Sequence, residues 1–230
     1  MKILISGGRV IDPATDRNGL SSVAAENGVI VAAEGSTATF DQIIDATGMW
    51  VCPGFVDLHS VVRDEFDEIA ALSGGFTTVV TTPDSMTHVS KRIRVLKAGA
   101  LTMGLDGLAL GEINDGEVCL SQGFRPLANA NVLRRALQYA SQLNVPVLVH
   151  SEDQNLSGRG VVGEGVTATR LGLPTVPKSA ETSIVARDLE LVEETNGRLH
   201  FSHLTCARSV ALVADAKRRG LRVTADRLLT

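Results

Sequence analysis

Aromatic residues are scarce in this chain of 230 residues: only 3% are Phe, Trp or Tyr, although 44% of all residues are hydrophobic. A core of ordinary size must therefore be packed with Val, Leu, Ile and Ala, which suits helices layered on a sheet. The length is sufficient for one near-complete α/β barrel, or for a large domain with a small one beside it.

Cysteine is also sparse. Cys52, Cys119 and Cys206 are odd in number, widely spaced and form no CxxC motif. We expect these thiols to be reduced and buried, as is usual in cytosolic proteins. The N-terminal stretch MKILISGGRVIDP contains one lysine and an apolar run too short for a signal peptide. A cytoplasmic location is therefore expected.

The chain has no basic stripe and no long hydrophobic run. Its formal net charge is −4, with acidic and basic residues interspersed, so binding to nucleic acid has no electrostatic support. No stretch reaches the ~18 consecutive apolar residues that a membrane span requires. The sequence therefore predicts neither a nucleic-acid partner nor a membrane association.

Residues 1–52 are predicted to form a small β-rich domain. Asn27-Gly28 lies between two short apolar stretches and is a strong hairpin signal. Such a set of strands is too small to stand alone and is expected to pack on the next domain. The predicted strands are Lys2–Ser6, Arg9–Ile11 (after a turn at Gly7-Gly8), Val23–Glu26, Val29–Ala33 and Ile43-Ile44.

Residues 53–230 alternate between strand and helix patterns, which indicates βαβ units and a parallel sheet. About seven strands are predicted, where a closed barrel has eight, and the connection after the second strand is unusually short for a parallel crossover. The predicted strands are 55–59, 77–82, 94–98, 118–121, 145–150, 198–203 and 221–225, and the predicted helices are 65–73, 105–113, 129–143, 179–196 and 206–219.

Three histidines fall at the ends of predicted strands: His59, His150 and His203. In a parallel barrel, ligand and catalytic groups gather at the C-terminal ends of the strands, and catalytic zinc commonly takes three protein ligands and a water. Each histidine alone could equally be a hydrogen-bonded residue at a strand end. His200 lies three residues before His203, so on a regular strand it faces the other way and is interpreted as structural. His88 is interpreted as a surface histidine.

Several motifs, taken in order, resemble the dihydroorotase family of metal-dependent amidohydrolases. The resemblance covers nearly the whole chain and implies a TIM-barrel-like metal-dependent hydrolase fold, incomplete at its C-terminal side, with a small N-terminal β-sandwich-like domain. The motifs are PGFVDLH followed by Arg63, GGFTTVV (74–80), GALTMGLDG (99–107), VPVLVHSED (145–153), ARDLELVEETNGRLHFSHLT (186–205) and VTAD (223–226).

The resemblance also implies roles for individual residues. His59, His150 and His203 match metal ligands, and Arg63 matches the arginine that holds the substrate carboxylate. Asp84, in Thr-Pro-Asp-Ser, occupies a substrate-contacting position where the family has asparagine. Asp84 is also the one nearby carboxylate that we can propose for catalysis.

The sequence departs from the family pattern around the expected site. Val61 replaces the second histidine of His-x-His-x-Arg, and Gln122 stands where active members carry an acidic residue. The family's general-base aspartate belongs to an eighth strand that has no counterpart here. The resemblance therefore implies zinc, at most one ion per chain. A degenerate paralogue and a longer chain that has lost its active-site loops would both give this pattern.

Two functions follow from the resemblance. The favoured one is a weakly catalytic or non-catalytic pseudo-dihydroorotase that acts in pyrimidine biosynthesis as a structural partner of aspartate transcarbamoylase. The alternative is an active zinc-dependent dihydroorotase that opens or forms the cyclic amide linking dihydroorotate and carbamoyl aspartate. Because seven strands leave two open sheet edges, we also expect the chain to form oligomers.

Overall fold

The computed structural model describes residues 1–32, 39–85 and 90–227. Contacts between Cα atoms divide the chain into two compact units, Met1–Phe55 and Val56–Thr230. His88, which we interpreted as a surface residue, lies outside the described residues, as does part of the short connection after the second predicted barrel strand.

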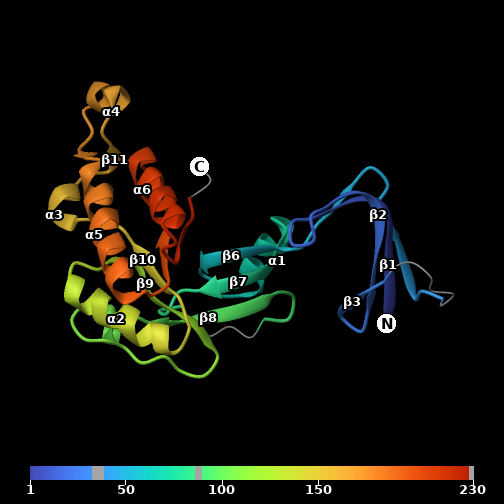
Figure 1. Ribbon diagram of the computed structural model, residues 1–230. Coiled ribbons are helices and arrows are strands. Elements are labelled where there is room, and N and C mark those ends of the chain that lie inside the picture. The colour runs from blue at the N-terminus through green and yellow to red at the C-terminus, as the bar shows by residue number, and fades with distance from the viewer. Residues whose placement is uncertain (33–38, 86–89, 228–230) are drawn as a thin grey trace. The chain divides into compact units, whose positions relative to one another are not determined.

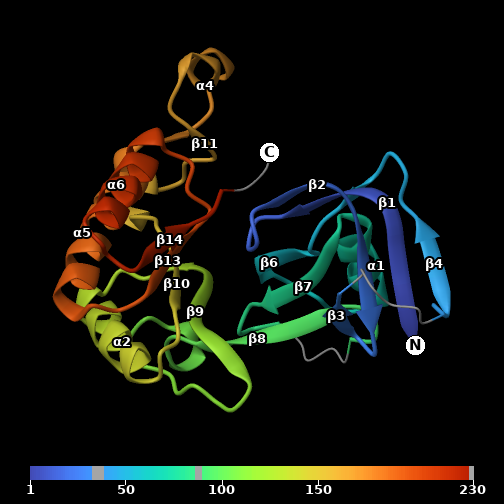
Figure 2. The same cartoon turned by 45° about the vertical axis from the view of Figure 1, so that its right-hand side comes forward.

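The first unit is built on one long strand. β1 (Lys2–Asp12) pairs antiparallel with β2 (Arg17–Glu26) and parallel with β4 (Gln42–Asp45) and β5 (Trp50–Val51). The short β3 (Val29–Val31) continues the sheet beyond β2, giving the order β3-β2-β1-β4 (Figures 1 and 2).

The hairpin predicted at Asn27-Gly28 is confirmed. Both residues have positive φ angles, 51° and 83°, which a two-residue type I′ turn requires. The predicted turn at Gly7-Gly8 is wrong, because β1 runs through it with a shift in register against β2 between Ile5 and Gly8. Gly7 has a φ of 76°, so it absorbs a bulge, and the two strands predicted on either side of it are one.

The second unit is built on a seven-stranded sheet in the order β14-β13-β10-β9-β8-β7-β6. Every neighbouring pair from β7 to β14 is parallel. Each strand matches one predicted from the sequence, so the α/β fold with about seven barrel strands is confirmed (Figure 2). The strands are β6 (Phe55–Ser60), β7 (Phe76–Thr81), β8 (Arg94–Ala100), β9 (Glu117–Pro126), β10 (Val147–His150), β13 (Leu199–Ser202) and β14 (Val223–Ala225).

Three long helices cover one face of this sheet: α2 (Ala130–Gln142), α5 (Ser179–Thr195) and α6 (Ala207–Arg218). Both ribbon views show them side by side, with α5 between α2 and α6 (Figures 1 and 2). α2 packs on β10, and α6 packs on β14. Their apolar stripes and the central strands form the main core, in which Phe201 of β13 is fully buried. As the composition predicts, nearly all other members of that core are aliphatic.

Four of the five predicted helices are present. They include α1 (Glu65–Ser73), whose first turn is capped by the side chain of Asp64. The helix predicted over residues 105–113 is wrong. A single 3₁₀ turn at Met103–Leu105 replaces it, and Gly104, Leu105 and Gly107 have φ angles of 59°, 57° and 78°. These left-handed conformations prevent an α-helix from propagating.

Between β10 and α5 the chain forms an arm that ends in a short helix. Its elements are α3 (Gln154–Ser157), β11 (Val162–Gly163), α4 (Val166–Leu171) and β12 (Thr175–Val176), and β11 and β12 pair parallel to each other. Among the described residues, no helix has the length and apolar character needed to cross a bilayer.

Replacing Phe201 with alanine should lower the free energy of unfolding by about 3–5 kcal/mol, because the change removes a buried ring and leaves a cavity. Chemical denaturation of the whole chain measures the change. The matched control is Phe66→Ala on α1, where the ring is 81% exposed, and its effect should stay within about 0.5 kcal/mol. Equal losses in the two variants would contradict this description of the core.

Candidate functional site

The candidate site lies where strands of the second unit end. His59 is near the end of β6, His150 is the last residue of β10, and His203 directly follows β13. Because parallel strands present their carboxyl ends at one edge of the sheet, these side chains share that edge.

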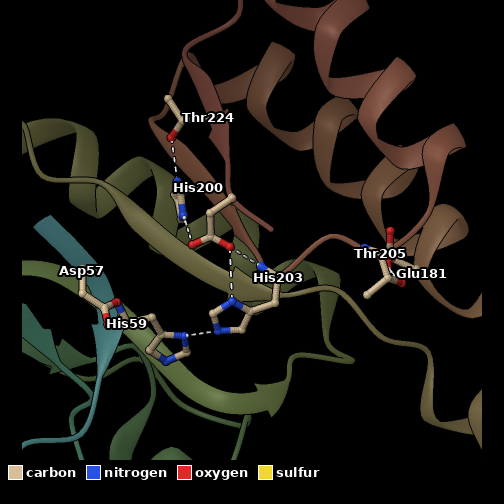
Figure 3. Close-up of polar contacts among 8 residues, drawn as sticks. Asp57, His59, Glu181, His200, His203, Thr205 and Thr224 are labelled. Carbon is tan, nitrogen blue, oxygen red and sulfur yellow. Dashed lines mark hydrogen bonds and ion pairs between the residues drawn. The ribbon is translucent and has the colours of Figure 1, made fainter. Parts of the chain in front are cut away.

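The imidazoles of His59 and His203 are in direct contact. Nδ1 of His59 lies 3.0 Å from Nε2 of His203, and the two rings are nearly parallel (Figure 3). Phe124, from the end of β9, stacks on the His59 ring with 4.3 Å between ring centroids. These contacts join three strand ends that are far apart in the sequence.

A carboxylate that we did not single out as a site residue organises the other side of His203. Oδ1 of Asp226 accepts a hydrogen bond from the backbone N–H of His203 and lies 3.2 Å from its Nδ1. Oδ2 of the same carboxylate lies 3.1 Å from Nε2 of His200. The other ring nitrogen of His200 is 2.8 Å from the hydroxyl of Thr224. A continuous polar chain therefore runs from Thr224 to His59 (Figure 3).

The expectation that His200 faces away from His203 is wrong, because both rings approach the carboxylate of Asp226. His203 has a φ of 64°, so the alternation of a regular strand ends at Ser202 and cannot be used to place the His203 ring. His200 pairs with Thr224 across β13 and β14. Thr224 and Asp226 are two residues apart, and on a strand this spacing puts both side chains on one face. This spacing was the signal in the sequence that Asp226 could lie beside His200.

Burial and neighbouring charges shift two pKa values in this network. Desolvation, followed by the nearby His203, lowers the pKa of His59 to about 4. Burial alone would raise the pKa of Asp226, but the hydrogen bonds from His200 and from the His203 amide outweigh it and hold that pKa at about 2. At neutral pH, His59 is therefore neutral and Asp226 is ionised.

His150 lies in a neighbouring pocket of about 760 Å³, which His203 also lines. Its Nε2 is 3.4 Å from a carboxylate oxygen of Glu152. Lys178, Glu181 and Arg208 contribute charged groups to the same pocket, so it could bind a polar molecule.

The two residues proposed to contact substrate are held in ion pairs. Arg63 is 3.1 Å from Asp67, one helical turn away, and its side chain is 65% exposed. Asp84 lies 3.7 Å from Arg125 at the end of β9. Each charge is thus balanced by a neighbour on the surface of the second unit.

Gln122 occupies a buried position in β9 with only 1% of its surface exposed. Its side-chain oxygen accepts a hydrogen bond of 3.0 Å from the hydroxyl of Thr102. The amide is therefore a satisfied part of the core. Val61, at the other departure from the family pattern, is partly exposed just beyond β6.

The fit of these residues to a metal ion can be judged from their geometry. Two ligands bound at ~2.0–2.1 Å in a tetrahedral zinc site are roughly 3.3 Å apart. Nδ1 of His59 and Nε2 of His203 are 3.0 Å apart, so an ion shared by these two nitrogens would replace the hydrogen bond between them. Nε2 of His59 and Nδ1 of His150 are buried without a hydrogen-bond partner. Within the described parts of the chain, however, no three His, Cys, Asp or Glu side chains are grouped closely enough to hold a metal. The described side chains therefore do not by themselves complete a metal site, and the number of ions bound stays a prediction.

Comparison with solved structures defines the class of fold. The dihydropyrimidinase from Brevibacillus agri superposes with a TM-score of 0.75 at 22% identity, covering 99% of this chain and 57% of that one. A D-hydantoinase (dihydropyrimidinase) from Thermus sp. gives a TM-score of 0.73 at 20% identity, covering 98% of this chain and 57% of that one. The second unit therefore has the sheet of an incomplete TIM barrel.

The chain belongs to the dihydroorotase family, because the family described as "Dihydro-orotase-like" matches residues 48–209. Dihydroorotase from Syntrophus aciditrophicus is 38% identical over 98% of this chain and 60% of its own length. Dihydroorotase from Anaeromyxobacter sp. (strain K) is 39% identical over 97% of this chain and 59% of its own. The chain thus spans about 60% of the length of these curated relatives.

The metal-free chain should lose stability as the pH falls from 6.5 towards 4. Between these values the unfolded chain protonates His59 while the folded chain does not, so the unfolded state binds more protons and gains stability. The loss should be on the order of 2–3 kcal/mol and complete below the folded pKa of about 4. Urea denaturation at a series of pH values, with a chelator present, measures it.

His59→Gln should flatten this pH dependence, because the variant has no imidazole to protonate at that position. Phe66→Leu, which changes no titrating group, should keep the wild-type slope. The protonation of Asp226 also lowers the stability of the folded chain, but at lower pH. That loss occurs between its unfolded pKa of 3.8 and its folded pKa of about 2. Equal slopes for wild type and His59→Gln would contradict the assignment.

Proposed function

We propose that this chain is a dihydroorotase-like protein of pyrimidine biosynthesis that turns over little or no dihydroorotate and serves as a structural partner of aspartate transcarbamoylase. The observation that carries the proposal is Gln122, buried and hydrogen-bonded to Thr102 where active members of the family are expected to have a carboxylate. A neutral amide in a satisfied core position is a poor substitute for an anionic metal ligand.

Two further features support weak catalysis. Val61 has no atom that could ligate a metal in place of the second histidine. Asp84, the one carboxylate proposed to move a proton, is paired with Arg125 and would also repel an anionic substrate. General acid–base catalysis typically contributes ~10²–10⁴-fold. The carboxylate of Asp226 is nearer to the histidines, but it is occupied by contacts with His200 and His203.

An active zinc-dependent dihydroorotase is the second candidate. The unpartnered, buried ring nitrogens of His59 and His150 favour it, because a metal ion would satisfy them. His59, His150 and His203 would hold that ion, and Arg63 would bind the substrate carboxylate once released from Asp67. Zinc, when bound, lowers the pKa of its water towards neutrality and supplies a nucleophile for the cyclic amide. In both candidates we propose that the protein acts in the cytoplasm.

Purified chain should contain at most one zinc ion per polypeptide, and its dihydroorotate turnover should be at least ~10²-fold below that of an active homologue assayed in parallel. The double variant Val61→His/Gln122→Asp should increase metal content more than turnover, because it adds ligands but no proton donor. Elemental analysis and a turnover assay measure the two effects. Family-level turnover by the unmodified chain, abolished by His150→Ala, would favour the second candidate instead.

The chain should also associate, with itself or with aspartate transcarbamoylase, rather than remain a free monomer at micromolar concentration. β6 forms one edge of the seven-stranded sheet, and its Val56 is 54% exposed. Open strand edges with apolar side chains favour pairing, and lysine on an edge opposes it. Sedimentation velocity, alone and with the transcarbamoylase, measures the association.

Val56→Lys on β6 should weaken this association. The control is Val166→Lys on the α4 arm, where the side chain is also exposed but belongs to no sheet edge. A stable monomer of the unmodified chain that neither self-associates nor sediments with the transcarbamoylase would refute the structural role.

A further inference from the structure

The hydrogen bonds around Asp226 determine where the protons of three histidines lie. We propose that Asp226 is a positioning residue: its carboxylate orients His200 and His203 so that the lone pair of His203 Nε2 faces His59. This role requires neither a bound metal nor turnover, so its test does not depend on the proposed function.

The carboxylate of Asp226 accepts a hydrogen bond from the backbone N–H of His203, and an ionised aspartate side chain can only accept hydrogen bonds. The two ring nitrogens that face it, Nε2 of His200 at 3.1 Å and Nδ1 of His203 at 3.2 Å, must therefore carry hydrogens. A neutral imidazole has one N–H and one lone pair. Nδ1 of His200 is then an acceptor for the hydroxyl of Thr224, which lies 2.8 Å away.

The position of the hydrogen on His203 also fixes the form of His59. In its neutral form with the hydrogen on Nδ1, His203 presents a lone pair at Nε2, and the 3.0 Å contact then requires a hydrogen on Nδ1 of His59. The remaining lone pair of His59 is then on Nε2. That nitrogen is buried without a hydrogen-bond partner, so every polar atom in the chain from Thr224 to His59 is assigned without conflict.

Asp226 also holds the backbone of His203. The φ of 64° at His203 is unfavourable for a residue with a side chain, and such conformations persist where surrounding contacts impose them. The carboxylate accepts from the His203 N–H as well as approaching its ring. The backbone N–H groups of Asp226 and Leu204 bond to the carbonyls of Phe201 and Asp226, which fixes the carboxylate relative to β13. The ring is thus held at two points, and a rotation of χ1 alone would break the arrangement.

Nuclear magnetic resonance of the full, isotopically labelled, metal-free chain at neutral pH tests the proposal. Long-range proton–nitrogen correlations distinguish the two neutral forms of each histidine, and backbone couplings assign them. We expect His203 to carry its hydrogen on Nδ1 and His200 on Nε2. Asp226→Ala should shift His203 to the form with hydrogen on Nε2, and Asp226→Asn should alter at least one of the two histidines, because an amide accepts through only one of its two atoms.

Two controls separate positioning from a general effect on folding. Asp57→Asn changes another carboxylate of the site, one that accepts only the backbone N–H of His59 at 3.0 Å, and His203 should keep its wild-type form. Thr224→Val removes the hydroxyl at the far end of the chain and should also leave His203 unchanged.

The wild-type spectrum decides the proton positions even if Asp226→Ala does not fold. A His203 that carries its hydrogen on Nε2, or on both nitrogens, overturns the proposal. So does a folded Asp226→Ala variant whose His203 matches wild type, or an Asp57→Asn variant that shifts His203 as strongly as Asp226→Ala.

Discussion

The parallel alignment of the strands in the second unit is the constraint on which the rest of the structure depends. Parallel pairing needs apolar strands covered by helices, and α2, α5 and α6 provide that cover through an aliphatic core around Phe201. The same alignment puts the carboxyl ends of the strands at one edge. In the strand order, β7, β8, β9 and β10 lie between β6 and β13, so the sheet must also curl to bring His59 within 3.0 Å of His203.

Electrostatics at this edge follow from burial. A buried imidazole resists protonation, which explains the low pKa of His59, and a buried carboxylate persists only with donors around it. Asp226 has three such donors, on His200 and His203. At β9, by contrast, the chain has the neutral Gln122, whose side-chain oxygen accepts a hydrogen bond from the hydroxyl of Thr102. Negative charge is therefore concentrated beside β13 and β14 rather than beside β9, and this distribution underlies the proposal of weak catalysis.

The network around Asp226 also links local conformation to side-chain chemistry. A left-handed His203 turns the chain sharply after β13, and the carboxylate that accepts from its backbone also sets the orientation of its ring. A single residue thus stabilises an unfavourable backbone conformation and presents a nitrogen lone pair towards β6. The tautomer of His203 reports the effect of Asp226 on the ring separately from its effect on the backbone.

The sequence by itself determined the elements that depend on local pattern. Apolar runs predicted all seven barrel strands, helical spacing predicted α2, α5 and α6, and Asn27-Gly28 predicted its hairpin, because each reflects neighbours a few residues apart. Local pattern failed where glycines adopt left-handed conformations, at Gly7 and in the 3₁₀ turn at Met103–Leu105. Only the tertiary structure decided which side chains meet at the site. β13 and β14 lie side by side in the folded sheet although they are separated along the chain. That proximity pairs His200 with Thr224 and places the carboxylate of Asp226 between two histidines.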